Sequence, residues 1–232
     1  MKIIAVIPAR IGSKGIPKKN IQLIGKKPLI QYSIESAKKS KVFDKILVST
    51  DSKQIAKISK SLGVEVPFIR PKRISGSYAT VKDVIKHAVN FLEKNQSYFP
   101  DIITILQPTS PFRDIKIIKK SISLLQKTKA TSVITVSELK KHPYKSFSYN
   151  KNFLKPFKKD FEKYESRQKI PKLFYHTGSV YSIWKNNLKN YNSIFGPRIK
   201  PIESSGILNI DIDVSSVLEM ARLLIRNKKL KY

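Results

Sequence analysis

The chain has 232 residues, of which 41% are hydrophobic and 9% aromatic, and these proportions are typical of a globular protein and exclude a disordered one. It has no cysteine, which excludes disulfides and thiolate metal sites, and no apolar run of about 20 residues that would span a membrane, so we expect a soluble, cytoplasmic protein without a membrane partner. The 46 Lys and Arg residues against 16 Asp and Glu residues give a net charge of +30, which favours anionic partners but also fits a bias toward lysine on solvated faces.

The first predicted element is a short buried strand that ends at Pro8 and runs into a basic loop, residues 9–20, which we call the cationic loop. Gly12 and Gly15 allow the backbone to approach a ligand closely. The side-chain cations are Arg10, Lys14 and one or both of Lys18 and Lys19. This pattern favours a cradle for a polyphosphate, although a solvated basic turn would give the same spacing. The loop matches neither a Walker A motif nor a dinucleotide-binding glycine motif, which disfavours a P-loop NTPase and a Rossmann dehydrogenase.

Strands and helices alternate along most of the remaining chain. We expect strands at residues 45–49, 64–68, 101–106, 132–136, 180–184 and 207–212. We expect a first helix at residues 28–40 and a second that ends at Gly63. We expect three further helices, which begin at a capping box of Thr80 and Asp83, at a cap formed by Asp114, and at Ser216. This alternation predicts an α/β fold with a parallel sheet that helices cover on both faces.

Ligands of such sheets bind outside the carboxyl ends of the strands. By this rule, the loops at Arg10, Asp51, Gln107 and Asp211 converge on one site. Two prolines stiffen the loop that follows Gln107, since they exclude both helix and strand pairing there.

Residues 138–175 interrupt the pattern within what we otherwise take as one domain, residues 1–232. The segment is rich in lysine and aromatic residues and has no clear period. Such a segment is suited to single-stranded nucleic acid, which stacks on aromatic side chains. We favour instead an arm that leaves the domain and packs on a second subunit, where aromatic residues are common anchors.

Asp211 and Asp213 form the second chemical signal. On a strand, two acids two residues apart point to the same face. Their oxygens suit Mg²⁺, which bridges to substrate phosphates, although a pair of acids at a strand edge would give the same pattern. Together with the cationic loop, the acid pair favours phosphoryl or nucleotidyl transfer, in which Mg²⁺ neutralises phosphate charge and the loop holds the leaving pyrophosphate.

Six motifs carry a resemblance to a known family. They are Ile-Pro-Ala-Arg at 7–10, Gly-Ser-Lys-Gly at 12–15, Lys-Asn at 19–20, Ser-Thr-Asp at 49–51, Leu-Gln-Pro-Thr-Ser-Pro at 106–111 and Asp-Ile-Asp at 211–213. In this order they resemble the acylneuraminate cytidylyltransferase family, which comprises the CMP-sialic acid synthetases and their bacterial relatives for legionaminic and pseudaminic acids. The CMP-Kdo synthetases resemble the chain less, because they have Ser-Thr-Arg-Leu-Pro where this chain has Ser-Lys-Gly-Ile-Pro at 13–17.

The resemblance implies a Rossmann-like α/β enzyme of the nucleotidyltransferase type. Such an enzyme uses Mg²⁺, transfers CMP from CTP to the anomeric hydroxyl of an anionic nine-carbon keto acid sugar, and releases pyrophosphate. The resemblance also implies a homodimer in which the arm, residues 138–175, reaches over the partner's site. The alternatives are another sugar nucleotidyltransferase, such as CMP-Kdo synthetase, and a basic nucleic-acid-binding protein.

The family's residue roles carry over by position. Catalytic roles fall on Arg10, Lys14, Lys19 and Asp213. Nucleotide contacts fall on Ala9, Arg10, Gly12, Ser13, Lys14, Lys19, Asn20 and Asp51. Metal contacts fall on Asp211 and Asp213, and sugar contacts fall on Gln107, Lys145, Arg167 and His176. For His176, a structural role in a turn is the alternative.

Two stretches depart from the family pattern. Arg73 and Ser77 stand where the family usually has acids, and Tyr-His-Thr-Gly at 175–178 replaces the Arg-Pro-Asn-Gly of many sialic acid enzymes. These departures concern the sugar rather than the nucleotide, and they leave the identity of the sugar open.

Overall fold

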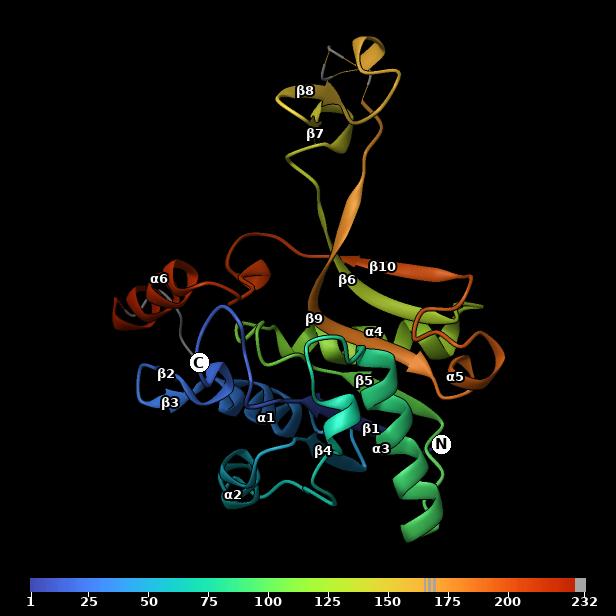
Figure 1. Cartoon of the computed structure of the whole chain (residues 1–232). Helices are drawn as coiled ribbons and strands as arrows, with labels where there is room; N and C mark the ends of the chain where they lie inside the picture. The colour runs from blue at the N-terminus through green and yellow to red at the C-terminus, as the bar shows by residue number, and fades with distance from the viewer. Residues whose placement is uncertain (165, 167, 169, 228–232) are drawn as a thin grey trace.

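Six strands form the central sheet of the computed structural model, which describes residues 1–164, 166, 168 and 170–227 (Figure 1). They are β1 (Ile3–Pro8), β4 (Lys45–Ser49), β5 (Ile102–Ile105), β6 (Ser132–Glu138), β9 (Phe174–Trp184) and β10 (Ile199–Glu203). Their spatial order is β10-β6-β9-β5-β1-β4, and β9 alone among these six runs antiparallel to its neighbours. The prediction of an α/β fold with a mostly parallel sheet is therefore confirmed.

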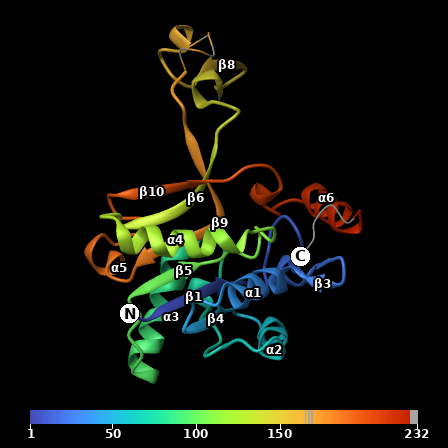
Figure 2. The same cartoon turned by 180° about the vertical axis from the view of Figure 1, so that it is seen from behind.

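Helices cover both faces of the sheet (Figures 1 and 2). They are α1 (Leu29–Ser40), α2 (Lys53–Ser61), α3 (Val81–Gln96), α4 (Ile115–Lys127), α5 (Asn187–Asn190) and α6 (Ser215–Arg226). The expected caps form, because the side chains of Thr80 and Asp114 accept hydrogen bonds from the backbone N–H groups of Asp83 and Lys116. Helices α1, α2 and α4 pack on one face, and α3 packs on the other.

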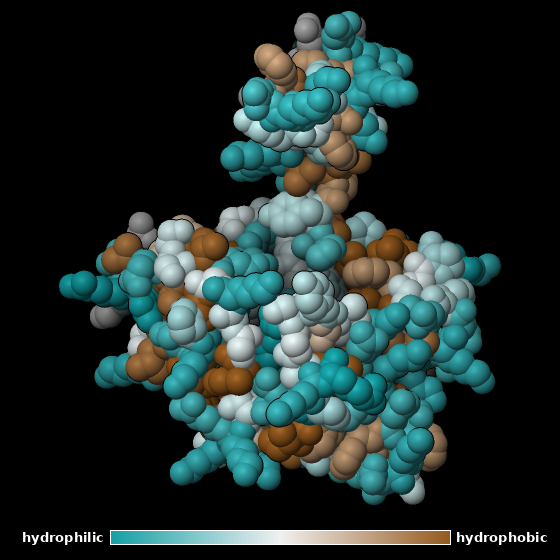
Figure 3. Space-filling view, viewed as in Figure 1, coloured by the Kyte–Doolittle hydropathy of each residue, from teal (hydrophilic) through white to brown (hydrophobic). Residues whose placement is uncertain are grey.

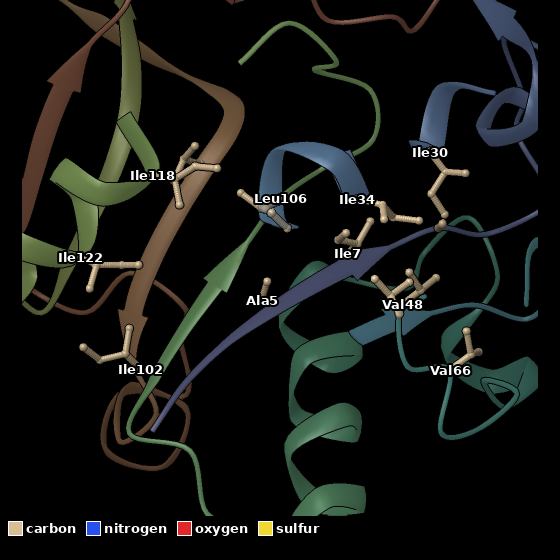
Figure 4. Close-up of a cluster of buried hydrophobic side chains, with 14 of the residues drawn as sticks. Ala5, Ile7, Ile30, Ile34, Val48, Val66, Ile102, Leu106, Ile118 and Ile122 are labelled. Carbon is tan, nitrogen blue, oxygen red and sulfur yellow. The ribbon is translucent and has the colours of Figure 1, made fainter. Parts of the chain in front are cut away.

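Strand β1 lies between these two helix layers. Ala5 and Ile7 pack with Ile34 of α1 on one face (Figure 4), whereas Ile4 and Val6 pack on the face that α3 covers. Successive side chains of a strand point to opposite faces, so a strand that is buried on both faces is continuously apolar. This explains why the first strand is a continuous apolar run in the sequence.

A third group of buried side chains joins the loops at the carboxyl ends of the strands, and we call it the site cluster. Its members are Ile16, Ile24, Leu29, Tyr32, Phe112, Ile212, Leu218 and Ala221. Ile16, Phe112 and Ile212 come from three separate loops, and Leu218 comes from α6. Burial of one such side chain stabilises the fold by about 1.5–3 kcal/mol, so the cluster holds the three loops together.

The arm leaves the body between β6 and β9 and extends away from the sheet (Figures 1 and 2). It contains an antiparallel hairpin of β7 (Phe147–Asn150) and β8 (Phe153–Pro156), with short 3-10 turns at Pro143–Lys145 and Glu162–Tyr164. Every residue of the two hairpin strands is exposed. The following strand is longer than the predicted 180–184, because β9 already begins at Phe174 and so includes the last residues of the predicted arm.

Two predicted strands are wrong. Residues 64–68 form one isolated bridge, from Leu47 to Glu65, and a second bridge joins Thr50 to Ile69 just beyond them; Pro67 lies between the two bridges and has no N–H group to donate to a ladder. Residues 207–212 contain a 3-10 turn at Gly206–Asn209 and then irregular chain.

The strand in this part of the chain is β10, which the sequence pattern did not indicate. It lies at the edge of the sheet, contains Pro201, and is exposed except at Ile202, so it lacks a regular apolar pattern. The remaining short elements are the hairpin of β2 (Leu23–Ile24) and β3 (Lys27–Pro28), and 3-10 turns at Lys19–Ile21 and Lys72–Ile74. Within the described ranges, no helix combines the length and the apolar character that a membrane crossing requires.

Candidate functional site

The cationic loop is held in place by its own backbone and by the next strand of the sheet. The N–H of Ala9 donates to the carbonyl of Ser49 at 2.9 Å, and the N–H of Ile11 donates to a carboxylate oxygen of Asp51 at 2.9 Å. The side-chain amide of Asn20 donates to the carbonyl of Arg10 at 2.8 Å and so closes the loop across its base. Asp51, which the family pattern places at the nucleotide, thus also fixes the loop that precedes it.

Lys19 is the lysine of this loop that points into the site. Its Nζ lies 2.6 Å from Oδ1 of Asp213, and only 12% of its side chain is exposed. Lys14 and Lys18 are exposed, and Lys18 has a left-handed backbone with φ of 50°. This geometry favours Lys19 over Lys18 as the residue that meets a bound anion.

Gly15 brings the cationic loop into direct contact with residues 211–213, which we call the acid turn. A Cβ atom at Gly15 would lie 2.2 Å from the carbonyl oxygen of Asp213, so no side chain fits there. Gly12 has no neighbouring atom within 4 Å of such a Cβ atom. At position 15, glycine therefore permits a close contact between the cationic loop and the acid turn. At position 12, the backbone faces open space.

The acid turn is irregular chain, so the prediction that its acids share one face of a strand is wrong. Ile212 between them is buried in the site cluster and donates its N–H to the carbonyl of Thr109 at 2.8 Å. With Ile212 anchored inward, both Asp211 and Asp213 remain at the surface on either side of it. The acids are thus placed together by an apolar anchor rather than by the pleat of a strand.

The surroundings of Asp211 raise the pKa of its carboxyl. Loss of surrounding water raises the pKa of the Asp211 carboxyl, and the neighbouring charge of Asp213 raises it further. A hydrogen bond with the side chain of Thr109 and the charge of Lys19 act in the opposite direction. A cation placed between the two carboxylates would relieve the repulsion between them.

The acid turn fits a hard divalent cation. Its two carboxylates are the oxygen ligands that Mg²⁺ prefers, and the ammonium of Lys19 already occupies the position of a cation beside Asp213. Among the described residues, no group of three or more His, Cys, Asp or Glu side chains could hold a metal ion. A metal bound here would therefore keep several water or phosphate ligands, as Mg²⁺ does in nucleotide sites.

The loop that begins at Gln107 is fixed by the buried guanidinium of Arg113, which is 2% exposed. Arg113 donates to the carbonyl of Gln107 at 2.6 Å, to Oγ of Ser33 at 2.8 Å and to the carbonyl of Ser179 at 3.0 Å. It therefore ties this loop to α1 and to β9. The sequence pattern gave no role to Arg113, and its position two residues after the second stiffening proline was the signal for it.

The side chain of Gln107 lies against Gly178 of β9. A Cβ atom on Gly178 would lie 3.5 Å from Oε1 of Gln107, and the φ of Gly178 is +76°, which disfavours other residues. The Gln107 amide is partly exposed and adjoins the stretch in which this chain departs from the family pattern.

His176 lies in this stretch, on strand β9 rather than in a turn, and it is exposed. Its Nδ1 lies 2.7 Å from the hydroxyl of Tyr181, and its ring packs near those of Tyr181 and Phe195. Burial raises the pKa of the Tyr181 hydroxyl, and the negative charge of Asp211 raises it further. Tyr181 thus stays a neutral hydrogen-bonding group that connects His176 to the neighbourhood of the acid turn.

Lys145 is a predicted sugar contact that is not brought to this place within one chain. Lys145 lies in the arm, which stands away from the body (Figures 1 and 2), and lines a hollow of about 720 Å³ at its stem. Lys140, Lys141 and Lys172 also line this hollow. Arg167 lies outside the described residues.

Arg70 is a site residue for which the sequence pattern gave no role. It is 5% exposed, and its Nε has no hydrogen-bond partner among the described residues. Burial lowers its pKa, Asp51 acts in the opposite direction and Arg10 adds to the lowering, so Arg70 lies within electrostatic reach of both. A buried guanidinium beside the cationic loop is suited to a polar ligand group. The signal for it was the Arg-Pro pair at 70–71.

Comparisons with known proteins identify a family for this chain. A family model described as cytidylyltransferase matches residues 4–230. The CMP-N,N'-diacetyllegionaminic acid synthase of Legionella pneumophila is 36% identical over 219 residues, which cover 92% of this chain and 91% of that protein. The pseudaminic acid cytidylyltransferase of Campylobacter jejuni is 32% identical over 226 residues, which cover 97% of this chain and 96% of that protein.

A solved structure supports the fold. The structure of CMP:2-keto-3-deoxy-manno-octonic acid synthetase complexed with CTP superposes with a TM-score of 0.71 and 17% identity, covering 98% of this chain and 100% of that one. At this identity, the likeness shows the shared fold alone.

Proposed function

The chain belongs to the cytidylyltransferase family, and from this premise we propose that it transfers CMP from CTP to a nonulosonic acid and releases pyrophosphate. Its similarity to a legionaminic acid synthase and a pseudaminic acid cytidylyltransferase over nearly its whole length supports a sugar of that type. The observation that carries the proposal is the contact of Lys19 with Asp213, because it joins the loop that we expect to bind phosphate to the acid pair that we expect to bind the metal.

In the proposed reaction, the cationic loop holds the triphosphate of CTP. Arg10, Lys14 and Lys19 supply positive charge, and Ser13 and Asn20 line the nucleotide pocket. As the anomeric hydroxyl of the sugar attacks the α-phosphorus, a new oxygen–phosphorus bond forms and the bond to the β-phosphate oxygen breaks. Negative charge then builds up on the departing pyrophosphate, and fixed cations stabilise that charge more in the transition state than in the ground state.

Asp211 and Asp213 would hold Mg²⁺. The ion, when bound, would neutralise charge on the phosphates of CTP. The acid turn itself contributes position, since Ile212 anchors it in the site cluster and Gly15 keeps it against the cationic loop.

The sugar would lie between Gln107 and His176, beside the acid turn. Gln107 offers an amide to the sugar's polar groups, and its position is fixed by Arg113 and Gly178. His176 offers a ring whose orientation is set by the hydrogen bond with Tyr181. Because 175–178 departs from the pattern of the sialic acid enzymes, we place the choice of sugar at this stretch.

The arm would complete the site across a dimer. Its exposed apolar side chains include Phe147, Tyr149, Phe153, Leu154 and Phe157. Side chains of this kind, held on a hairpin that extends from the body, are suited to burial against a second copy of the chain. Lys145 and Arg167 on one subunit's arm would then meet the sugar's carboxylate at the other subunit's site.

The test is pyrophosphate release from CTP and Mg²⁺ with a panel of N,N'-diacetyllegionaminic acid, pseudaminic acid, N-acetylneuraminic acid and Kdo. We expect release with a nine-carbon acid and its loss when EDTA removes the metal. Release with UTP or ATP and a different acceptor, together with no release from CTP and any sugar of the panel, would contradict the proposal. Within the cationic loop, Lys18→Ala is the matched control for Lys19→Ala, since both remove one positive charge.

A further inference from the structure

The ion pair between Lys19 and Asp213 joins two groups that the proposed reaction needs separately. Lys19 is proposed to bind phosphate, and Asp213 is proposed to bind the metal, yet in the structure they bind each other at 2.6 Å. One carboxylate oxygen of Asp213 is thereby occupied by a cation that belongs to the protein.

We propose that Lys19 is an internal cation that blocks the metal site of the free protein, so that a divalent ion binds tightly only together with the nucleotide. This proposal rests on the proposed function for the identity of the nucleotide, CTP. The triphosphate would give the ammonium of Lys19 a new anionic partner, and Asp213 would become available to the metal.

The geometry keeps this pair in place. Lys19 is the first residue of a 3-10 turn in which the next residue, Asn20, is buried. The side chain of Lys19 is itself largely buried. Asp213 is held by Gly15, whose backbone lies against its carbonyl, and by the buried Ile212 beside it. Since the Lys19 side chain is already largely buried, its pairing with the more exposed Asp213 orders fewer free groups than an ion pair between two exposed side chains.

The proposal also predicts how the two ligands influence each other. If CTP frees Asp213 and thereby raises the affinity for the metal, the metal must raise the affinity for CTP by the same factor. The coupling arises at the Lys19–Asp213 contact, so removal of the ammonium should both tighten metal binding to the free protein and reduce the gain that CTP brings.

A general charge effect is the alternative that the experiment has to separate. Any lysine near the acid turn repels a metal ion, whether or not it contacts a carboxylate. Lys18 is the matched control, because it is the adjacent residue of the same loop and has the same charge, but it is exposed. The comparison of Lys19→Met with Lys18→Met therefore isolates the contact from the charge.

The experiment is a titration of Mn²⁺ into the free protein, with unbound Mn²⁺ measured by electron paramagnetic resonance and with no sugar present. We expect Lys19→Met to bind Mn²⁺ about five-fold more tightly than the natural protein, the gain expected from loss of one competing ion pair. We expect Lys18→Met to stay within about two-fold, which is the effect of a screened charge. Asp213→Asn should lose this binding, which shows that the measured site is the acid turn.

A second titration with CTP present tests the coupling. CTP should tighten Mn²⁺ binding to the natural protein and to Lys18→Met, and it should tighten binding to Lys19→Met by a smaller factor. Equal affinities of Lys19→Met and Lys18→Met for Mn²⁺ in the free state would overturn the proposal. Lys19→Gln provides a second variant with the same expectation, and circular dichroism confirms that each variant is folded.

This outcome is separate from that of the proposed function. If the contrast between Lys19→Met and Lys18→Met is present but CTP tightens no variant, the internal cation is supported and CTP is the wrong nucleotide. If pyrophosphate release is found but the contrast is absent, the function stands and the internal cation is refuted.

Discussion

Replacement of Gly15 by alanine tests whether the contact between the cationic loop and the acid turn organises the site. The new Cβ atom would lie 2.2 Å from the carbonyl oxygen of Asp213, whereas ordinary contacts begin at 3.4 Å. The atom it meets belongs to the backbone, so a rotation of a side chain cannot relieve the overlap. The loop and the acid turn must separate by roughly 1 Å, a shift of the kind that overpacking causes.

The expected magnitude follows from two opposing terms. Overpacking of this kind costs about 1–3 kcal/mol, and the lower entropy of the unfolded chain with alanine offsets about 0.4–1 kcal/mol. The net loss of about 1–2 kcal/mol would lower Tm by about 2–8 °C for a chain of this size. Because a misplacement of about 1 Å can reduce turnover about 100-fold, kcat/KM for pyrophosphate release should fall by roughly that factor.

The assay pairs thermal unfolding with pyrophosphate release, and Gly12→Ala is the matched control for stability. Position 12 belongs to the same loop, but a Cβ atom there would meet nothing within 4 Å, so Tm should stay unchanged or rise slightly. Equal Tm values for the two variants, with full activity in Gly15→Ala, would refute the reasoning.

Four further outcomes are expected. Arg113→Lys should lower the stability by about 2–4 kcal/mol in urea unfolding, since lysine cannot reproduce the three hydrogen bonds that the buried guanidinium donates, and an unchanged midpoint would contradict this role. Lys14→Ala should reduce kcat/KM for CTP about 10- to 100-fold without a change in Tm, whereas Lys18→Ala should have little effect on either. Burial and two nearby arginines lower the pKa of His87 below 6.5, so its contribution to stability is complete above pH 6.5 and is lost as the pH falls toward the lowered pKa; His87→Gln should remove this part of the pH dependence of Tm. Phe153→Lys in the exposed hairpin should weaken the proposed dimer in sedimentation while the monomer stays folded, and an unchanged sedimentation coefficient would argue against the arm as the interface.

The elements that the sequence predicted well are those whose local pattern and burial agree. Strand 45–49 has the predicted bounds, and the caps at Thr80 and Asp114 bond as their residue types require. The failures lie where the pattern and the environment differ. Residues 64–68 have the composition of a strand but contain Pro67, and β10 is a true strand that lies exposed at the sheet edge.

The candidate site residues could be proposed from the sequence because they lie in short motifs, but their contacts could not. Lys19 and Asp213 are 194 residues apart, and the sequence contains no signal that one contacts the other. Arg113 and Arg70 were missed for a related reason. Both are arginines in a chain with 46 Lys and Arg residues, and apart from the neighbouring prolines only their burial distinguishes them from the solvated majority. Figure 3 shows that hydrophilic side chains are spread widely over the face it presents, so exposed charge by itself does not mark the site.

The acid pair shows that two residues can lie close together for a reason other than the predicted one. Two acids with one residue between them share a side if that residue is anchored on the other side, and a strand is only one way to achieve this. Here Ile212 is anchored in the site cluster, together with Ile16 and Phe112 from the other two loops and Leu218 from α6. The relative positions of the cationic loop, the acid turn and the Gln107 loop therefore depend on the docking of α6 as well as on the sheet. Because α6 follows the acid turn directly, the last helix of the fold helps to set the distance between the cationic loop and the acids.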